Sequence, residues 1–276
     1  MGYPRLAAIA VLTVLVIGAC TAGGSPAPAG TLAKAKAAGV LTVGLSSGAP
    51  IGFVDASGTP KGVTIDICNE FIKREGIATL EVYLMPFASE IPALTSNRID
   101  LACDTFFPTE KRKEVVQFTD ILFYNSETLI VKKGNPKNIH KLDDMAGNSG
   151  ASYEGTVWID WLDELNARGL NVTVKSYPSP TELFADVSAG RVDAGIIDAI
   201  LAGYALVQNP DLDFELVADY IPRDKVSNAV SMPLRKDSND LVAALNATIS
   251  AMKADGSMNA IFEKWGLTPP SYYLNP

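Results

Sequence analysis

The sequence has very little histidine and no run of basic residues. His140 is the only histidine in the chain, which argues against a histidine-based metal site or a Ser-His-Asp triad. The formal net charge is −8. An acidic chain without a basic tract is a poor candidate for binding nucleic acid or an anionic membrane surface. We expect neither a metal nor a cofactor.

Long apolar runs are also scarce. One such run, Leu6 to Ile17, follows Arg5 and ends at Gly18-Ala19-Cys20. It is too short to span a bilayer comfortably, and small residues precede the cysteine, so residues 1–19 are predicted to be a secretory signal. No other segment is apolar enough to cross a membrane.

The sequence around Cys20 also resembles a bacterial lipobox, in which cleavage precedes the cysteine and a lipid is attached to it. The alternative is a plain signal peptide with an incidental cysteine. The small, Pro- and Gly-rich residues that follow favour the lipobox, because an anchored domain needs a tether. We therefore predict an extracytoplasmic protein anchored through Cys20, with residues 20–37 as the lipidated cysteine and flexible tether.

Two further cysteines complete the set of three. Cys68 falls on a predicted helix, and Cys103 on a predicted strand. Outside the cytoplasm such a pair is frequently bridged, and packing of the helix on the strand would allow it. The alternative is two buried free thiols.

The order of predicted elements argues for an open α/β fold. In the first half, strands are predicted at residues 40–45, 79–85 and 99–103, and a helix at 89–97. Residues 53–55 and 61–63 flank a turn, which predicts a hairpin. Asp66 is predicted to cap a further helix, which ends at Gly76. In the second half, strands 149–152, 172–177 and 192–197 alternate with helices 158–168, 181–189 and 199–207. A strand at 229–234 and a helix at 238–254 follow.

A weak internal repeat links the two halves. Residues 94–103 resemble residues 187–196, and in both segments a helix turns through Asn-Arg or Gly-Arg into a buried strand. The first strand ends at Asp104 and Thr105, and the second at Asp198. Ligands of open α/β sheets collect at the carboxyl ends of strands. Two facing sheets would therefore bring these residues to opposite walls of one cleft.

Arg112 is the candidate cation of that cleft. Thr109 is predicted to be a helix N-cap, which would let Arg112 turn back toward the strand end. A guanidinium facing an acid suits an amino acid zwitterion, because the arginine binds the carboxylate and the acid binds the ammonium. On spacing alone, residues 109–114 also fit a solvated charge run.

Several motifs resemble the extracytoplasmic solute-binding proteins of polar amino acid ABC transporters, nearest the glutamate/aspartate branch. The similarity covers about residues 41–267. Its motifs are Leu41-Thr-Val-Gly, Gly62-Val-Thr-Ile-Asp-Ile, Ile91-Pro-Ala-Leu-Thr-Ser-Asn-Arg-Ile-Asp, Thr109-Glu-Lys-Arg, Gly155-Thr and Gly190-Arg-Val-Asp. The resemblance implies a two-lobed periplasmic-binding-protein fold (type II), with mostly parallel sheets and two strands crossing a hinge. Lobe 1 would comprise residues 38–124 and 230–276, and lobe 2 residues 125–229.

The resemblance also implies individual roles. Arg112 would bind the α-carboxylate, Asp198 the α-ammonium, and Thr105 would add a hydrogen bond. The loop containing Thr156 and Val157 would present backbone N–H groups at a helix N-terminus. Some members carry a cysteine pair at the positions of Cys68 and Cys103.

Other positions depart from the family pattern. Phe107 stands where a hydroxyl is expected, and an aromatic is missing from the segment that begins at Ser46, so stacking on the ligand would fall to Phe53 or Phe107. Val157 replaces a second threonine. Asp104 and Glu154 add acid near the cleft, which favours a neutral or cationic ligand side chain. Equally, Asp104 could cap a turn and Glu154 could face water.

The resulting prediction is a monomeric binding protein, not an enzyme, that delivers a small polar solute to a membrane permease. One alternative is a periplasmic dehydratase-like enzyme using Asp104 or Glu154 as an acid or base. Another is a sensor that presents its ligand to a membrane receptor. Tyr153 and Trp158 could line the cleft, but aromatics on helix faces are more often core, so packing is favoured for both.

Overall fold

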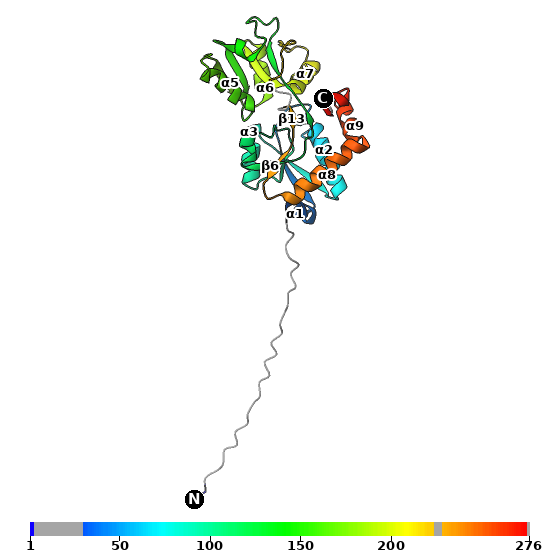
Figure 1. Ribbon diagram of the computed structural model, residues 1–276. Coiled ribbons are helices and arrows are strands. Elements are labelled where there is room, and N and C mark those ends of the chain that lie inside the picture. The colour runs from blue at the N-terminus through cyan, green and yellow to red at the C-terminus, as the bar shows by residue number, and fades with distance from the viewer. Residues whose placement is uncertain (3–29, 224–227, 275–276) are drawn as a thin grey trace.

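Two α/β lobes are stacked end to end in the computed structural model, which describes residues 1–2, 30–223 and 228–274 (Figure 1). The lipobox cysteine Cys20 and almost all of the predicted signal peptide lie outside these residues. In the part of the chain that is described, no helix is both long and apolar enough to cross a bilayer. The two-lobed α/β architecture predicted from the sequence is confirmed, but the sheets are mixed rather than mostly parallel, because antiparallel strands complete one side of each.

The first lobe is built on a mixed five-stranded sheet. Its strands, in spatial order, are β4 (Thr79–Leu84), β1 (Val40–Leu45), β5 (Leu101–Ala102), β14 (Pro233–Arg235) and β6 (Val116–Phe118). β1 pairs in parallel with β4 and β5, whereas β14 runs antiparallel to β5 and β6. The helices of this lobe are α1 (Thr31–Ala38), α2 (Val63–Glu75), α3 (Phe87–Thr95), α4 (Glu110–Lys113), α8 (Asn239–Asp255), α9 (Ser257–Lys264) and α10 (Pro270–Leu274). A small hairpin, β2 (Phe53–Val54) with β3 (Pro60–Lys61), completes it.

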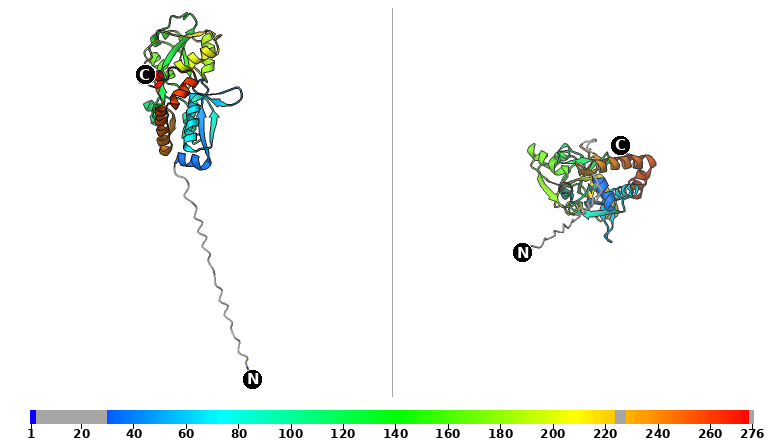
Figure 2. Two further views of the ribbon diagram at one scale, coloured as in Figure 1. Left: turned by 90° about the vertical axis from the view of Figure 1, so that its right-hand side faces the viewer. Right: turned by 90° about the horizontal axis from the view of Figure 1, so that it is seen from below.

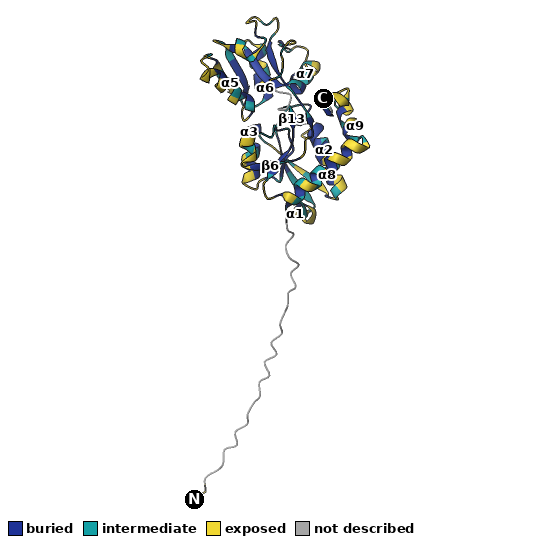
Figure 3. Cartoon of the chain, in the orientation of Figure 1, coloured by how far each residue is buried: buried dark blue, intermediate teal, exposed yellow. Residues whose placement is uncertain are grey.

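The second lobe repeats this plan. Its strands, in spatial order, are β10 (Thr173–Tyr177), β9 (Ser149–Tyr153), β11 (Ala194–Asp198), β8 (Glu127–Lys132) and β12 (Phe214–Leu216). Its helices are η1 (Leu142–Met145), α5 (Val157–Ala167), α6 (Pro180–Ser188) and α7 (Ala199–Gln208). In both lobes the central strands are buried and the outer helix faces are exposed (Figure 3).

The two halves of the sequence repeat occupy equivalent places. β5 and β11 are each the third strand of their sheet, and each follows a helix, α3 or α6, that turns directly into it. Asp104 lies just beyond the carboxyl end of β5, and Asp198 is the last residue of β11. The predicted placement of both acids at strand ends is therefore confirmed.

Two short antiparallel strands connect the lobes. They are β7 (Phe123–Tyr124) and β13 (Ala229–Val230), and they lie between the two large sheets (Figures 1 and 2). The sequence predicted one strand over residues 229–234, but the chain forms β13 there, passes Ser231 and Met232, and begins β14 in lobe 1. The break arises because the segment leaves the hinge pair and joins a different sheet.

Two other boundaries differ from the prediction. Residues 31–37 were assigned to the tether but form α1, which is held because Asp240 accepts hydrogen bonds from the backbone N–H groups of Thr31 and Ala33. Helix α2 begins at Val63 after Gly62, rather than at Asp66, which lies in its first turn. Gly62 has a φ of 127°, and a Cβ there would lie 2.4 Å from the carbonyl oxygen of Ile51, so this helix start requires glycine.

Helix α2 is joined covalently to the end of β5. The sulfurs of Cys68 and Cys103 are bonded, and both residues are fully buried. The bridge predicted from the sequence is therefore present, and it ties α2 to the residue that precedes Asp104.

Candidate functional site

A small closed cavity lies between the lobes. Its volume is about 10 Å³, about the minimum needed for one water molecule. Both lobes contribute to its wall, which consists of Phe87, Thr105, Phe107, Arg112, Tyr153, Thr156, Val157, Trp158 and Asp198. Ten residues were predicted to bind the ligand, and six of them line this cavity: Thr105, Phe107, Arg112, Thr156, Val157 and Asp198.

Arg112 reaches across from the first lobe. Thr109 is the N-cap of α4, and its hydroxyl accepts a hydrogen bond from the backbone N–H of Arg112. The guanidinium then donates to the carbonyl of Phe107 at 2.9 Å and, in the other lobe, to the carbonyl of Gly155 at 2.8 Å. It also lies over the rings of Phe106 and Phe87, 5.0 and 5.7 Å from their centroids. Burial lowers the pKa of Arg112 to about 10.

Asp198 provides the opposite charge from the second lobe. It is 5% exposed, and its carboxylate accepts hydrogen bonds from the amide of Asn125 at 2.6 Å and the hydroxyl of Tyr153 at 3.0 Å. Burial raises the pKa of Asp198 to about 7, and the negative charge of Asp104 adds to the effect. Burial of the Tyr153 hydroxyl raises its pKa, and the nearby negative charge of Asp198 raises it further.

Neither charge has an ionic partner among the described residues. Arg112 is held by carbonyl oxygens, and Asp198 by an amide and a hydroxyl. A buried charge without an opposite charge is costly. The cavity therefore presents one unpaired cation and one unpaired anion to the same small space.

Two aromatic residues assigned to the core belong to this cavity as well. Tyr153 binds Asp198, and Trp158 packs edge-on against both Tyr153 and Phe107. Trp158 is 1% exposed, yet its Nε1–H has no hydrogen-bond partner among the described residues. Both residues are buried as favoured, and they also line the cleft, which was the alternative, because the strand β9 and the start of α5 direct both rings to the interface between lobes. Asn125 was not predicted, since nothing in its local sequence links it to Asp198.

Asp104 is buried but does not line this cavity. Its carboxylate accepts hydrogen bonds from the backbone N–H groups of Ser46, at 3.2 Å, and Thr105, at 2.7 Å, and from the Ser46 hydroxyl. Asp104 therefore ties together the ends of β1 and β5. This arrangement corresponds to the turn-capping alternative. Ser46 lies at a neighbouring interlobe cavity of about 310 Å³, which Phe87 and Tyr153 also line.

Two predicted ligand contacts lie elsewhere. Phe53 packs edge-on against Trp265, with ring centroids 5.7 Å apart, and Glu154 is exposed. Neither is among the residues around the closed cavity. Glu154 precedes Gly155, whose Cβ, if present, would lie 2.8 Å from the Cα of Ala88 in the facing lobe. The lobes approach closely at Gly155, and the side chain of Glu154 lies on the solvent side of this contact.

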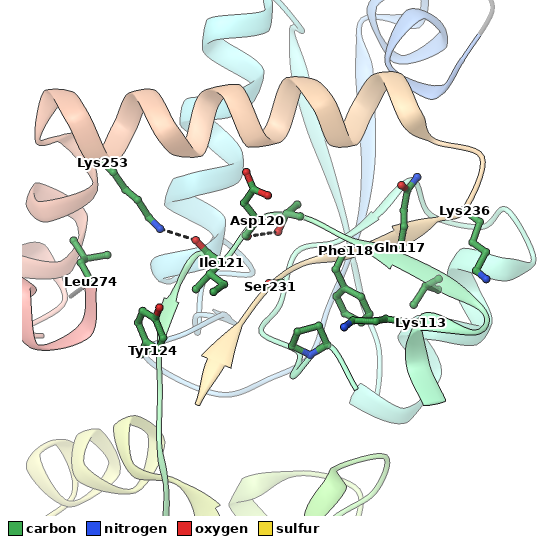
Figure 4. Close-up of a pocket in the computed structure, with 13 residues that line it drawn as sticks. Lys113, Gln117, Phe118, Asp120, Ile121, Tyr124, Ser231, Lys236, Lys253 and Leu274 are labelled. Carbon is green, nitrogen blue, oxygen red and sulfur yellow. Dashed lines mark hydrogen bonds between the residues drawn. The ribbon is translucent and has the colours of Figure 1, made fainter. Parts of the chain in front are cut away.

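A larger cavity, of about 920 Å³, is a different feature. It is an open groove on the first lobe beside the hinge, lined by residues of β6, β7 and α8 among others (Figure 4). Of its three lysines, Lys253 donates to the carbonyl of Ile121, Lys113 pairs with Glu110, and Lys236 is exposed. No buried, unpaired charges converge there, so we assign the candidate site to the small interlobe cavity.

Comparisons with known proteins agree with this geometry. The sequence model of the bacterial extracellular solute-binding proteins, family 3, matches residues 41–268. The L-cystine-binding protein of Escherichia coli (strain K12) is 29% identical over 264 residues, which cover 95% of each chain. The lysine/arginine/ornithine-binding periplasmic protein of the same organism is 28% identical over 219 residues, which cover 79% of this chain and 83% of that protein.

A solved structure shows the same fold. An ancestral arginine-binding protein bound to arginine superposes with a TM-score of 0.76 and is 31% identical. The similarity covers 82% of this chain and 98% of that one. Both the family assignment and the two-lobed fold predicted from the sequence are therefore supported by independent comparisons.

Proposed function

Because the chain belongs to the bacterial extracellular solute-binding proteins of family 3, we propose that it binds an amino acid between its lobes and delivers it to an ABC transporter permease. The observation that carries this proposal is the pair of unpaired charges, Arg112 and Asp198, on opposite walls of one cavity. An α-amino acid carries both complementary charges. Its carboxylate would bind Arg112, and its ammonium would bind Asp198.

The geometry also explains why binding favours closure. In the open state each charge faces water, whereas in the closed state both are buried. A zwitterion that bridges the lobes compensates the two burial costs together, so its binding free energy stabilises the closed form. The Nε1–H of Trp158, which has no hydrogen-bond partner among the described residues, supplies a further donor for an acceptor on the ligand. Closure is then the signal that the permease can detect.

The side chain of the ligand is proposed to be neutral or cationic. Beyond Asp198, the buried acid Asp104 lies on the first-lobe side of the interface, and Arg112 is the one arginine in the cavity wall. The excess of buried acid repels an anionic side chain. Arginine binding by the similar ancestral protein supports the same class.

A panel of amino acids tests the function directly. We expect calorimetric titration to show binding of arginine, lysine or a neutral polar amino acid with a Kd of roughly micromolar, equivalent to about 8 kcal/mol. Glutamate should bind at least about 100-fold more weakly, because its side-chain carboxylate faces buried acid. Tight binding of glutamate alone would contradict the proposed ligand class, and absence of binding throughout the panel would contradict the function.

The affinity should depend on pH through Asp198. Its pKa is about 7 in the closed cleft, and the ligand ammonium requires the ionised form. Affinity should therefore be greatest above pH 7 and fall on acidification by up to about tenfold per pH unit, because binding must displace a proton. In Asp198→Asn, binding should be weak and flat between pH 5 and 8. Calorimetry with arginine as the probe measures both curves, and a flat wild-type curve would reject this role for Asp198.

The lipid anchor and the absence of catalysis are also proposals. Attachment through Cys20 would hold the lobes near the permease, with the residues before α1 as a tether. A dehydratase-like role would need an acid or base free to reach the ligand. Asp104 is bonded to Ser46 and Thr105, and Glu154 is exposed, so neither residue favours that alternative.

A further inference from the structure

A second buried acid lies behind the ligand cleft. Glu90 is in the first turn of α3 and is completely inaccessible to solvent, and neither of its carboxyl oxygens has a hydrogen-bond partner among the described residues. It lies one helical turn after Phe87, which lines both interlobe cavities. The charged group that acts on it is the carboxylate of Asp104, itself 6% exposed.

The surroundings of Glu90 provide no cation. Helix α3 packs against β1, β5, β6 and β14. β1, β5 and β6 carry no charged side chain, and Arg235 of β14 is bonded to Asp100 and to the carbonyl of Ile99. Across the cleft, Asp198 and Tyr153 face Asp104. Arg112 lies over the ring of Phe87 and donates to Phe107 and Gly155.

Two buried carboxylates without a cation cannot both be ionised. The hydrogen bonds decide which one keeps the proton. Asp104 accepts three hydrogen bonds, from Ser46 and Thr105, and these favour its ionised form. Glu90 has none, and burial together with the charge of Asp104 raises its pKa well above the ordinary value.

We propose that Glu90 is a positioning residue for the ligand cleft: it retains its own proton beside the ionised Asp104, and this singly charged pair fixes Ser46 and Thr105 at the cleft edge. The inference rests on the proposed function only for its effect on ligand affinity. Loss of the proton at alkaline pH places two negative charges side by side in the core. Asp104 is then displaced, and Ser46 and Thr105 lose their common acceptor.

The test compares the wild-type chain with Glu90→Gln, which keeps the shape and a neutral donor, and with Glu263→Gln as an exposed control on α9. We expect the unfolding equilibrium constant of the wild type to rise with pH above about 4.5, relative to Glu90→Gln, by up to about tenfold per pH unit. The sign follows because the native state holds a proton that the unfolded state has released. Glu263→Gln should follow the wild type.

Two further measurements test positioning. The backbone amide resonances of Ser46 and Thr105 should shift together as the wild-type pair titrates, and should stay constant in Glu90→Gln. The arginine affinity of the wild type should fall relative to Glu90→Gln over the same pH range. Parallel unfolding curves for these two proteins would overturn proton retention by Glu90. Amide resonances that titrate in the same way in both proteins would overturn positioning. If neither protein binds any amino acid, the proposed function fails, while the unfolding and amide measurements still decide the role of Glu90.

Discussion

Replacement of Arg112 by methionine is expected to weaken amino acid binding by about 100-fold or more, equivalent to about 2.8 kcal/mol. The guanidinium is partly buried, lies over two aromatic rings and has no carboxylate partner among the described residues. It is therefore poised to form a charge-assisted pair with a ligand carboxylate, and such pairs are strong when water is excluded. Methionine preserves much of the side-chain volume but removes every donor.

The stability of the ligand-free protein separates this role from a structural one. Arg112→Met should change the free energy of unfolding by less than about 1 kcal/mol, because the burial cost of the unpaired guanidinium offsets its two hydrogen bonds to carbonyls. Arg168, whose exposed guanidinium pairs with Asp143, provides the matched control. Arg168→Met should bind normally in calorimetry. Normal binding by Arg112→Met would remove this residue from the proposed site.

Loss of the Cys68–Cys103 bridge is expected to lower the free energy of unfolding by about 3–4 kcal/mol. The bonded residues are 35 positions apart, and closing a loop of this length restricts the unfolded chain by about that amount. The bridge also holds α2 against the end of β5, next to Asp104 and Thr105. Its loss should therefore reduce ligand affinity as well as stability.

Urea denaturation with and without a thiol reductant measures the effect. Reduction should shift the wild-type midpoint to lower urea, and the double variant Cys68→Ala/Cys103→Ala should show the lower midpoint in both conditions. Since both residues are fully buried, the reductant must be present throughout unfolding. Two alkylatable thiols in the unreduced, denatured wild type would show that the bridge does not form.

Local sequence was sufficient for the features that depend on nearest neighbours along the chain. The apolar run of β1, the threonine cap of α4 and the glycine that ends α2 were all predicted at their observed positions, because each is determined by side chains a few residues apart. The repeated segments that end in β5 and β11 also identified the strand ends where Asp104 and Asp198 lie.

Motif position was less informative about where side chains point. The sequence left open whether Asp104 and Glu154 approach the ligand or instead cap a turn and face water; in the structure Asp104 binds backbone groups of its own lobe and Glu154 is exposed. Glu90 carried no signal at all, since a glutamate in the first turn of a helix is ordinary on the surface and exceptional only when buried. Trp158 and Tyr153 had the pattern of core residues and are indeed buried, but at the interface between lobes.

The sequence by itself therefore determined the two α/β series, and it indicated the cysteines that could pair and the candidate cation and anion of the site. Tertiary structure decided which of the acids face the cleft and which lie behind it. The reason is that helix caps and strand periodicity act over a few residues, whereas burial and electrostatic pairing depend on groups that only folding brings together. Arg112 and Gly155, 43 positions apart, belong to different lobes and meet only through the fold. Glu90 becomes a proton-holding group only because α3 packs on four strands and Asp104 lies near it.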